Sequence, residues 1–177
     1  MSPEVRARRF SRAIDSSIDI DAPPQKVWDA LLDLPRWAEW NAFIPSVKGA
    51  LEVGQKVKVK VVPPGRKPFP FAFPAEVRVV RPFEEIVWGG GFLGFVYQGD
   101  HGIWLERLPD GGTRFRQRER MRGPLVLLNL ALGLLAPTKL GYDQMNEALK
   151  QRVEAFGAIA GRPPEPMVIG KGAEEKW

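Results

Sequence analysis

The sequence predicts an α+β fold in which a curved antiparallel β-sheet of six to seven strands wraps around one long C-terminal α-helix. Three observations lead to this prediction. Apolar and polar residues alternate with a period of two through much of residues 14–122, as in half-buried strands. Residues 142–156 instead carry apolar side chains at spacings of three and four, as in an amphipathic helix. Most of the strands follow one another without intervening helices, which favours an α+β sheet over a parallel α/β sheet.

The chain opens with a strand and a short helix. One parity of residues 14–20 holds three isoleucines and Ser16, whereas the other holds two aspartates and a serine, so one face of this strand is expected in water. Prolines 23 and 24 suit the first turn of a helix, and the apolar residues that follow recur at helical spacing up to Pro35. The aromatic-rich segment 36–43 is expected to form helical turns and a loop.

From residue 46 onward the pattern is that of strands. Lysines at 56, 58 and 60 alternate with valines, residues 75–80 alternate again, and residues 85–88 form a short strand. The proline-rich segment 63–74 is predicted to be a long, stiff connection between two of these strands. Residues 97–107 and 113–122 are predicted as the two long strands of a hairpin around a Pro-Asp-Gly-Gly turn.

The last element is a long helix, and it determines the expected architecture. Its apolar stripe consists of Tyr142, Met145, Leu149, Val153 and Phe156. The simplest way to bury this stripe is against the concave face of the sheet, which leaves a hydrophobic cavity. The domain is predicted to span residues 12–160, between an N-terminal tail of residues 1–11 and a flexible C-terminal tail of residues 161–177.

The apolar segment Leu125–Ala136 allows two interpretations. If the segment is helical, its leucines lie on nearly every side of the helix, and Asn129 is its polar residue. The default expectation is burial as an extension of the last helix. The alternative is an exposed lid or a lipid-facing patch.

Composition excludes several kinds of chemistry. The chain of 177 residues has no cysteine, which excludes a disulfide framework, a thiol nucleophile and cysteine-ligated zinc. His101 is the only histidine, which excludes a poly-histidine metal site. No serine lies in a nucleophile-elbow pattern and no carboxylates have metal-ligand spacing, so neither a metal nor a cofactor is expected. No apolar run approaches the roughly 20 residues of a transmembrane helix, and a soluble, cytoplasmic protein is expected.

The net charge of +5 raises the question of nucleic-acid binding. Five arginines share one parity of the strand 113–122, which places them on a solvent face. We expect them to pair with an acidic row on the first strand rather than to bind nucleic acid. That row is Asp15, Asp19 and Asp21.

The glycine-rich segment 89–94 matches the dinucleotide-binding pattern G-x-G-x-x-G by letter only. A dinucleotide site needs a helix directly after the glycines, and here residues 95–97 lead into a strand. The glycines are therefore expected to permit a tight turn, a bulge or room at a cavity mouth.

The inward face of the hairpin carries the candidate site. A five-residue turn places Leu105 opposite Phe115, Ile103 opposite Gln117, and His101 opposite Glu119. A histidine and a carboxylate at cross-strand distance can share a proton and act as general acid or base, or simply satisfy each other structurally. The candidate catalytic residues are thus His101 and Glu119. The candidate ligand-binding residues are Trp40, Phe43, Trp88, Tyr97, Ile103, Leu105, Phe115, Gln117, Met121, Tyr142, Met145 and Leu149.

Three segments resemble the helix-grip proteins of the SRPBCC superfamily, which include the START domains, the birch pollen allergen group and the polyketide cyclase/dehydrase-like proteins. Residues 18–31, read as Ile-Asp-Ile-Asp-Ala-Pro-Pro-Gln-Lys-Val-Trp-Asp-Ala-Leu, resemble their opening strand and helix. Residues 37–44 resemble the aromatic stretch after their first helix. Residues 99–106 with 112–115 and Glu119 resemble the penultimate hairpin of the cyclase-like branch. The resemblance covers residues 12–160.

This resemblance implies a deep hydrophobic cavity and leaves three functional readings. The first is binding of a small hydrophobic ligand, which could be a lipid, a sterol-like molecule or an aromatic polyketide. The second is a metal-independent cyclase or dehydratase that uses His101 and Glu119, with Gln117 or Tyr142 orienting a carbonyl. The third is a lipid-transfer protein that docks on membranes through residues 125–136 and its basic surface. The oligomeric state and the identity of the ligand stay open.

Overall fold

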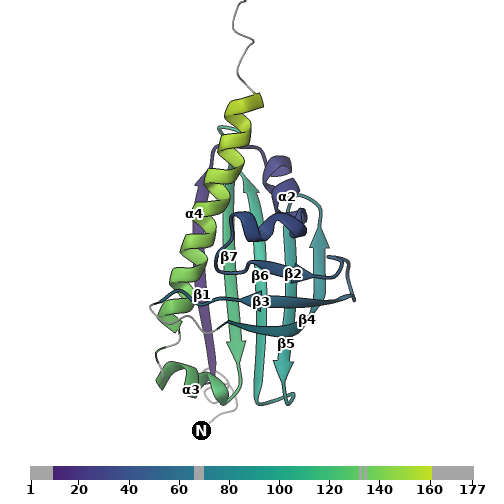
Figure 1. Cartoon of the computed structure of the whole chain (residues 1–177). Helices are drawn as coiled ribbons and strands as arrows, with labels where there is room; N and C mark the ends of the chain where they lie inside the picture. Colours follow the sequence, from purple (N-terminus) through teal and green to yellow (C-terminus); the bar gives the residue numbers. More distant parts are fainter. Residues whose placement is uncertain (1–9, 66–69, 132, 134, 161–177) are drawn as a thin grey trace, which may run out of the picture.

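The computed structural model describes residues 10–65, 70–131, 133 and 135–160 (Figure 1). Seven antiparallel strands form one sheet in the order β1-β7-β6-β5-β4-β3-β2. The strands are β1 (Ser11–Ile20), β2 (Ser46–Lys48), β3 (Lys56–Val61), β4 (Phe71–Arg81), β5 (Glu85–Phe92), β6 (Tyr97–Arg107) and β7 (Thr113–Arg122). The helices are α2 (Pro24–Leu32), the 3-10 helix η1 (Leu34–Glu39), α3 (Leu125–Ala131) and α4 (Leu135–Ala160). The predicted α+β architecture is confirmed.

The sheet curves so strongly that its two halves run in different directions. In Figure 1, β2 and β3 cross the view, whereas β1, β7 and β6 run along it with α4 lying beside β1. The apolar stripe of α4 is buried against this sheet through Tyr142, Met145, Leu149 and Val153. The core therefore lies between the concave face of the sheet and α4, as the sequence predicts.

The strand register of the hairpin is the predicted one. In the β6–β7 pair, His101 lies opposite Glu119, Ile103 opposite Gln117, and Leu105 opposite Phe115. Because side chains alternate across a strand, a slip of one residue would have turned all of them to the outer face. The inward orientation of the candidate residues on both strands thus follows from the register.

The acidic and basic rows pair across β1 and β7 only in part, since Arg122 pairs with Asp100 of β6 instead. Arg114 contacts both carboxylate oxygens of Asp19 at 2.9 and 3.0 Å, and Arg118 contacts Asp15 at 2.6 Å. Asp21 does not belong to this row, because β1 ends at Ile20; its backbone N–H donates to Glu154 instead.

The predicted connection 63–74 is too long. Strand β4 already begins at Phe71, and Pro74 lies inside it opposite Lys58 of β3. The other neighbouring strand, β5, approaches closely here: a Cβ at Gly90 would lie 2.6 Å from the Pro74 carbonyl oxygen. The glycine run 89–91 thus belongs to β5 and leaves room for the backbone of β4. It leads into the β5–β6 hairpin and not into a helix, as expected for a segment that is not a dinucleotide site.

The default expectation for residues 125–136 is wrong. They do not extend α4 as one buried helix; α3 is separate, and Val126 is its buried residue while Leu127, Leu128 and Leu130 are exposed. The C-terminal tail, which includes Trp177, and residues 1–9 of the N-terminal tail lie outside the described residues. Strand β1 begins at Ser11, which is predicted to lie in the N-terminal tail.

Candidate functional site

Three polar side chains meet on the concave face, below α4. The Tyr142 hydroxyl donates to Glu119 Oε2 at 3.0 Å and lies 3.0 Å from His101 Nδ1. His101 Nδ1 and Glu119 Oε2 are themselves 3.5 Å apart. The expectation that the histidine and the carboxylate both point inward is confirmed, but they make no direct hydrogen bond; a hydroxyl from α4 bridges them.

One arrangement of the protons satisfies all three groups. Burial, together with the Glu119 carboxylate, raises the pKa of the Tyr142 hydroxyl well above its usual range, so the phenol stays protonated at neutral pH. Its single proton is directed to Glu119, so the phenol oxygen accepts from His101 Nδ1–H. In a neutral imidazole, Nε2 then carries a free lone pair.

His101 Nε2 is the chemically available atom of the site. His101 is 4% exposed, and Nε2 has no hydrogen-bond partner among the described residues. The imidazole lies between two aromatic rings: its centroid is 4.8 Å from that of Trp88 and 5.0 Å from that of Tyr142, with which it is stacked. A buried polar atom without a partner is costly unless something binds it.

Phe43 extends this aromatic wall through a close contact with α4. Its ring meets the Tyr142 ring edge-on at 5.1 Å. A Cβ at Gly141 would lie 2.6 Å from Cγ of Phe43 and closer still to two other ring atoms. Only glycine therefore leaves room for the Phe43 ring against the helix.

A second buried polar network lies one helical turn further along α4. Asn146 Oδ1 accepts from Gln117 Nε2 at 2.5 Å, and its Nδ2 donates to Ser16 Oγ at 2.7 Å. Ser16 Oγ in turn donates to Asp143 at 2.6 Å, which is paired with Lys139 at the surface. Gln117 is thus held by Asn146 and does not join His101, although its Oε1 is buried without a partner.

Sequence reasoning missed Asn146, Ser16 and Gly141 as site-building residues. One signal was present: Asn146 lies four residues after Tyr142, which places a polar amide on the buried side of the last helix. Gly141, next to Tyr142 in the middle of a helical pattern, was a second signal, because glycine there usually has a packing reason.

The other predicted wall residues divide into three groups. Trp88 and Phe43 contact the cluster directly. Tyr97 lies close to it, since a Cβ at Gly99 would contact both Glu119 Oε1 and the Tyr97 hydroxyl; burial and the Glu119 carboxylate raise the pKa of Tyr97. Trp40 instead packs on Trp37 at 5.6 Å, and its Nε1 is buried without a partner. The remaining members are buried in the core around the site: Ile103, Leu105, Phe115, Met121, Met145 and Leu149.

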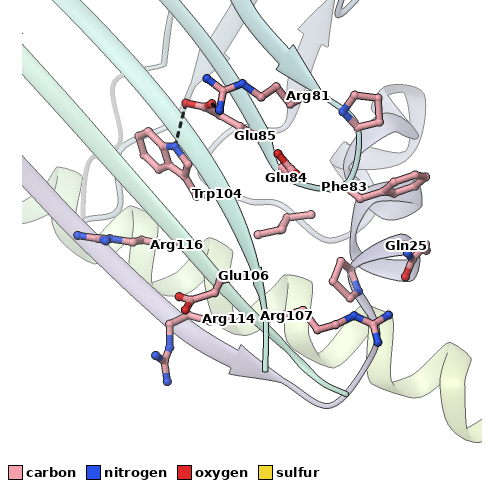
Figure 2. A pocket seen from close by; sticks show the side chains of 13 residues that line it. Gln25, Arg81, Phe83, Glu84, Glu85, Trp104, Glu106, Arg107, Arg114 and Arg116 are labelled. Carbon is pink, nitrogen blue, oxygen red and sulfur yellow. Dashed lines mark hydrogen bonds and ion pairs between the residues drawn. The ribbon is translucent and has the colours of Figure 1, made fainter. Parts of the chain in front are cut away.

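Two surface pockets occur away from this cluster. The groove of about 760 Å³ in Figure 2 is lined by Phe83, Trp104 and Arg116 among others, and Trp104 and Arg116 have the outward parity, opposite to that of His101. A second groove of about 800 Å³ lies along β1 and is lined by Asp15 and Lys139, each of which belongs to a different ion pair. Neither pocket is the predicted internal cavity, which stays a prediction.

No group of three or more potential metal-ligating side chains occurs in the part of the chain that the structure describes. The candidate site therefore consists of the imidazole, the phenol and the carboxylate, set in aromatic and aliphatic side chains. Such a set can bind one polar group of an apolar molecule and can relay a proton.

Comparison with known proteins places the chain in a family. The model of the family described as polyketide cyclase / dehydrase and lipid transport matches residues 11–154. The chain belongs to this family. The match covers both strands of the hairpin, the aromatic segment and most of α4, and it confirms the SRPBCC resemblance. None of the curated proteins matches this chain in sequence.

Solved structures show the same fold at low sequence identity. Protein CV1439 from Chromobacterium violaceum is 21% identical, with a TM-score of 0.61 over 80% of this chain and 96% of that one. The di-domain ARO/CYC StfQ from the steffimycin biosynthetic pathway is 11% identical, with a TM-score of 0.66 over 88% of this chain and 54% of that one. Ara h 8.0201 is 14% identical, with a TM-score of 0.55 over 82% and 99%. These matches show that the chain has the helix-grip fold.

Proposed function

We propose that the protein binds a small, largely hydrophobic molecule between the concave face of the sheet and α4. The observation that carries this proposal is His101 Nε2, a buried polar atom without a partner in an aromatic wall. A ligand hydroxyl that donates to Nε2 satisfies this atom, and the apolar remainder of the ligand contacts Trp88 and the buried side chains around it. Family membership supports the same class of ligand.

The arrangement favours a ligand with an acidic hydroxyl, such as a phenol or an enol. With Nδ1–H donating to Tyr142, Nε2 accepts and does not donate at neutral charge. A ligand that offers only hydrocarbon leaves Nε2 unsatisfied. The expected ligands are therefore aromatic or polyketide-like molecules, and lipids or sterols that carry a hydroxyl.

A matched pair of probes tests this proposal. The affinities of 1-naphthol and 1-methylnaphthalene, which differ in one hydroxyl, are measured by quenching of tryptophan fluorescence in the wild type and in His101→Phe. For a hydrogen bond of ordinary strength, the ratio of the affinity for 1-naphthol to that for 1-methylnaphthalene should be roughly three- to tenfold larger in wild type than in His101→Phe. Equal preference in both proteins would contradict an anchoring role for His101.

Proton-transfer catalysis is the second candidate function, and the bridging hydroxyl favours it. If Nε2 takes a proton from a bound substrate, Nδ1–H passes to the Tyr142 oxygen and the phenol proton passes to Glu119, so the Glu119 carboxylate becomes a neutral acid and the negative charge moves to the substrate. This is the chemistry that a metal-independent cyclase or dehydratase needs. Glu119→Gln separates the two functions, since it removes the final proton acceptor and leaves Nε2 free to bind 1-naphthol. Retained binding with lost turnover of a substrate would identify an enzyme.

A further inference from the structure

Two segments without any charged residue meet at one end of the molecule. The first lies between Glu85 and Asp100 and the second between Arg122 and Lys139. In Figure 1, the β5–β6 turn and α3 lie together at the lower end, away from the C-terminal end of α4. The Leu125 N–H donates to the Val96 carbonyl oxygen at 3.2 Å, which joins the two segments directly. We call residues 93–96 together with 125–131 the apolar tip.

The apolar tip exposes large hydrophobic side chains from both segments. Phe95 is 85% exposed and Leu93 68%. The exposed leucines of α3 are Leu127, Leu128 and Leu130, and Leu140 on α4 is exposed just outside the apolar tip. Single exposed leucines are ordinary, but several large exposed apolar side chains on two joined segments indicate an interaction site.

The exposed side chains indicate what kind of surface they meet. They are aliphatic or phenyl groups, and Asn129 is the one polar side chain in α3. Protein interfaces surround such groups with hydrogen-bonding partners, whereas lipid hydrocarbon needs none.

Basic residues flank the apolar tip. Arg120 and Arg122 end β7 directly before α3, Arg12 lies beside them on β1, and Lys139 follows in α4. Two carboxylates, Asp100 and Asp143, pair with Arg122 and Lys139, whereas Arg120 has no ion pair within the described residues. A positive rim around an apolar surface is complementary to the anionic headgroups above a bilayer interior.

We propose that the apolar tip docks on an anionic membrane surface, with Leu93, Phe95 and the leucines of α3 inserted among the lipids. The helix α3 has seven residues, so it lies in the interface and does not cross the bilayer. In the described part of the chain, no single helix has the length and apolar character of a membrane span, and only α3 and α4 taken together across their bend reach that composition.

Docking through this end would bring the membrane close to the candidate site. Tyr97 directly follows the turn of the apolar tip, and Tyr142 lies two residues after Leu140. The docking proposal does not depend on the proposed interior ligand, because binding to vesicles is measured without one.

Co-sedimentation with vesicles tests the proposal. The full chain is mixed with vesicles of phosphatidylcholine and phosphatidylserine, or of phosphatidylcholine alone, at low and at high salt. We expect binding to the anionic vesicles that weakens at high salt, since the rim acts by charge. Phe95→Ser with Leu128→Ser should weaken this binding by roughly tenfold or more, because insertion scales with buried apolar area.

A matched double variant is the control. Leu32 on α2 is 44% exposed and Val53 in the β2–β3 loop is 64% exposed, and both lie outside the apolar tip. Leu32→Ser with Val53→Ser should leave vesicle binding unchanged, and both double variants should keep the wild-type circular dichroism and melting temperature. The proposal is overturned if wild type does not bind anionic vesicles, or if the control variant loses as much binding as the tip variant. It is also overturned if wild type is a dimer that does not bind vesicles and that the Phe95→Ser and Leu128→Ser substitutions dissociate.

Discussion

Replacing Tyr142 with phenylalanine removes one hydroxyl and leaves the ring in place. Two hydrogen bonds of 3.0 Å are lost, one of them to a carboxylate, and His101 Nδ1–H and Glu119 lose their partner in a buried site. Hydrogen bonds to charged groups contribute about 1.5–3 kcal/mol each. Because His101 Nδ1 and Glu119 Oε2 are already 3.5 Å apart, a small movement restores one direct contact. We therefore expect Tyr142→Phe to lower the free energy of unfolding by about 2 kcal/mol, with a loss of roughly 4–8 °C in melting temperature.

The assay is urea unfolding followed by tryptophan fluorescence, with the midpoint and the slope fitted separately. The protein has two tyrosines, and Tyr97→Phe is the matched control because the Tyr97 hydroxyl makes no hydrogen bond within the described residues. That control should stay within about 0.5 kcal/mol of wild type. If Tyr142→Phe is as stable as Tyr97→Phe, the hydroxyl does not bridge His101 and Glu119 and the assignment of protons in the site is wrong.

Three further predictions concern the same buried region. Because the pKa of Tyr142 is raised in the folded protein, its contribution to the free energy of unfolding is complete below a pH of about 10, the pKa of an unfolded tyrosine, and declines as pH rises above it. Between pH 8 and pH 12 the free energy of unfolding should therefore fall less steeply in Tyr142→Phe than in wild type, by up to about 1.4 kcal/mol per pH unit. Parallel curves for the two proteins would refute the raised pKa. Gly141→Ala should destabilise the protein, because the added Cβ overpacks against Phe43 at a cost of about 1–3 kcal/mol, which exceeds the gain of about 1 kcal/mol in helix propensity over glycine. Phe43→Leu in the Gly141→Ala background should relieve part of this loss. A Gly141→Ala variant more stable than wild type would show that the Phe43 ring moves freely. Asn146→Leu should cost about 1–3 kcal/mol by leaving Gln117 unpaired, whereas Asn146→Leu with Gln117→Leu should recover at least half of it, and additive losses in the double-mutant cycle would argue against a coupled pair.

The sequence contained enough information to predict the strand pairing around the site. Five arginines on one parity of β7 fixed its outer face, and a turn of five residues then fixed the register that places His101 opposite Glu119. Strand geometry is periodic and local, so a correct parity determines the orientation of every side chain on the strand.

The contribution of α4 could not be predicted in the same way. An apolar stripe shows which side of a helix is buried, but it does not show how far the helix is shifted along the sheet. That shift places the Tyr142 hydroxyl between His101 and Glu119, and Asn146 beside Gln117. Composition also could not decide whether residues 125–136 are buried, because burial depends on whether the sheet extends beneath them.

The central claim is that an interior ligand bonds to Nε2 of His101, and nuclear magnetic resonance of the imidazole tests it most directly. The protein has one histidine, so in a sample labelled with nitrogen-15 and free of a histidine tag both ring nitrogens are assigned without overlap. The account predicts that Nδ1 is protonated and Nε2 bare in the free protein, and that titration with 1-naphthol shifts the Nε2 resonance far more than that of Nδ1. A bound 1-naphthol that leaves the Nε2 resonance unchanged at saturation would contradict the account.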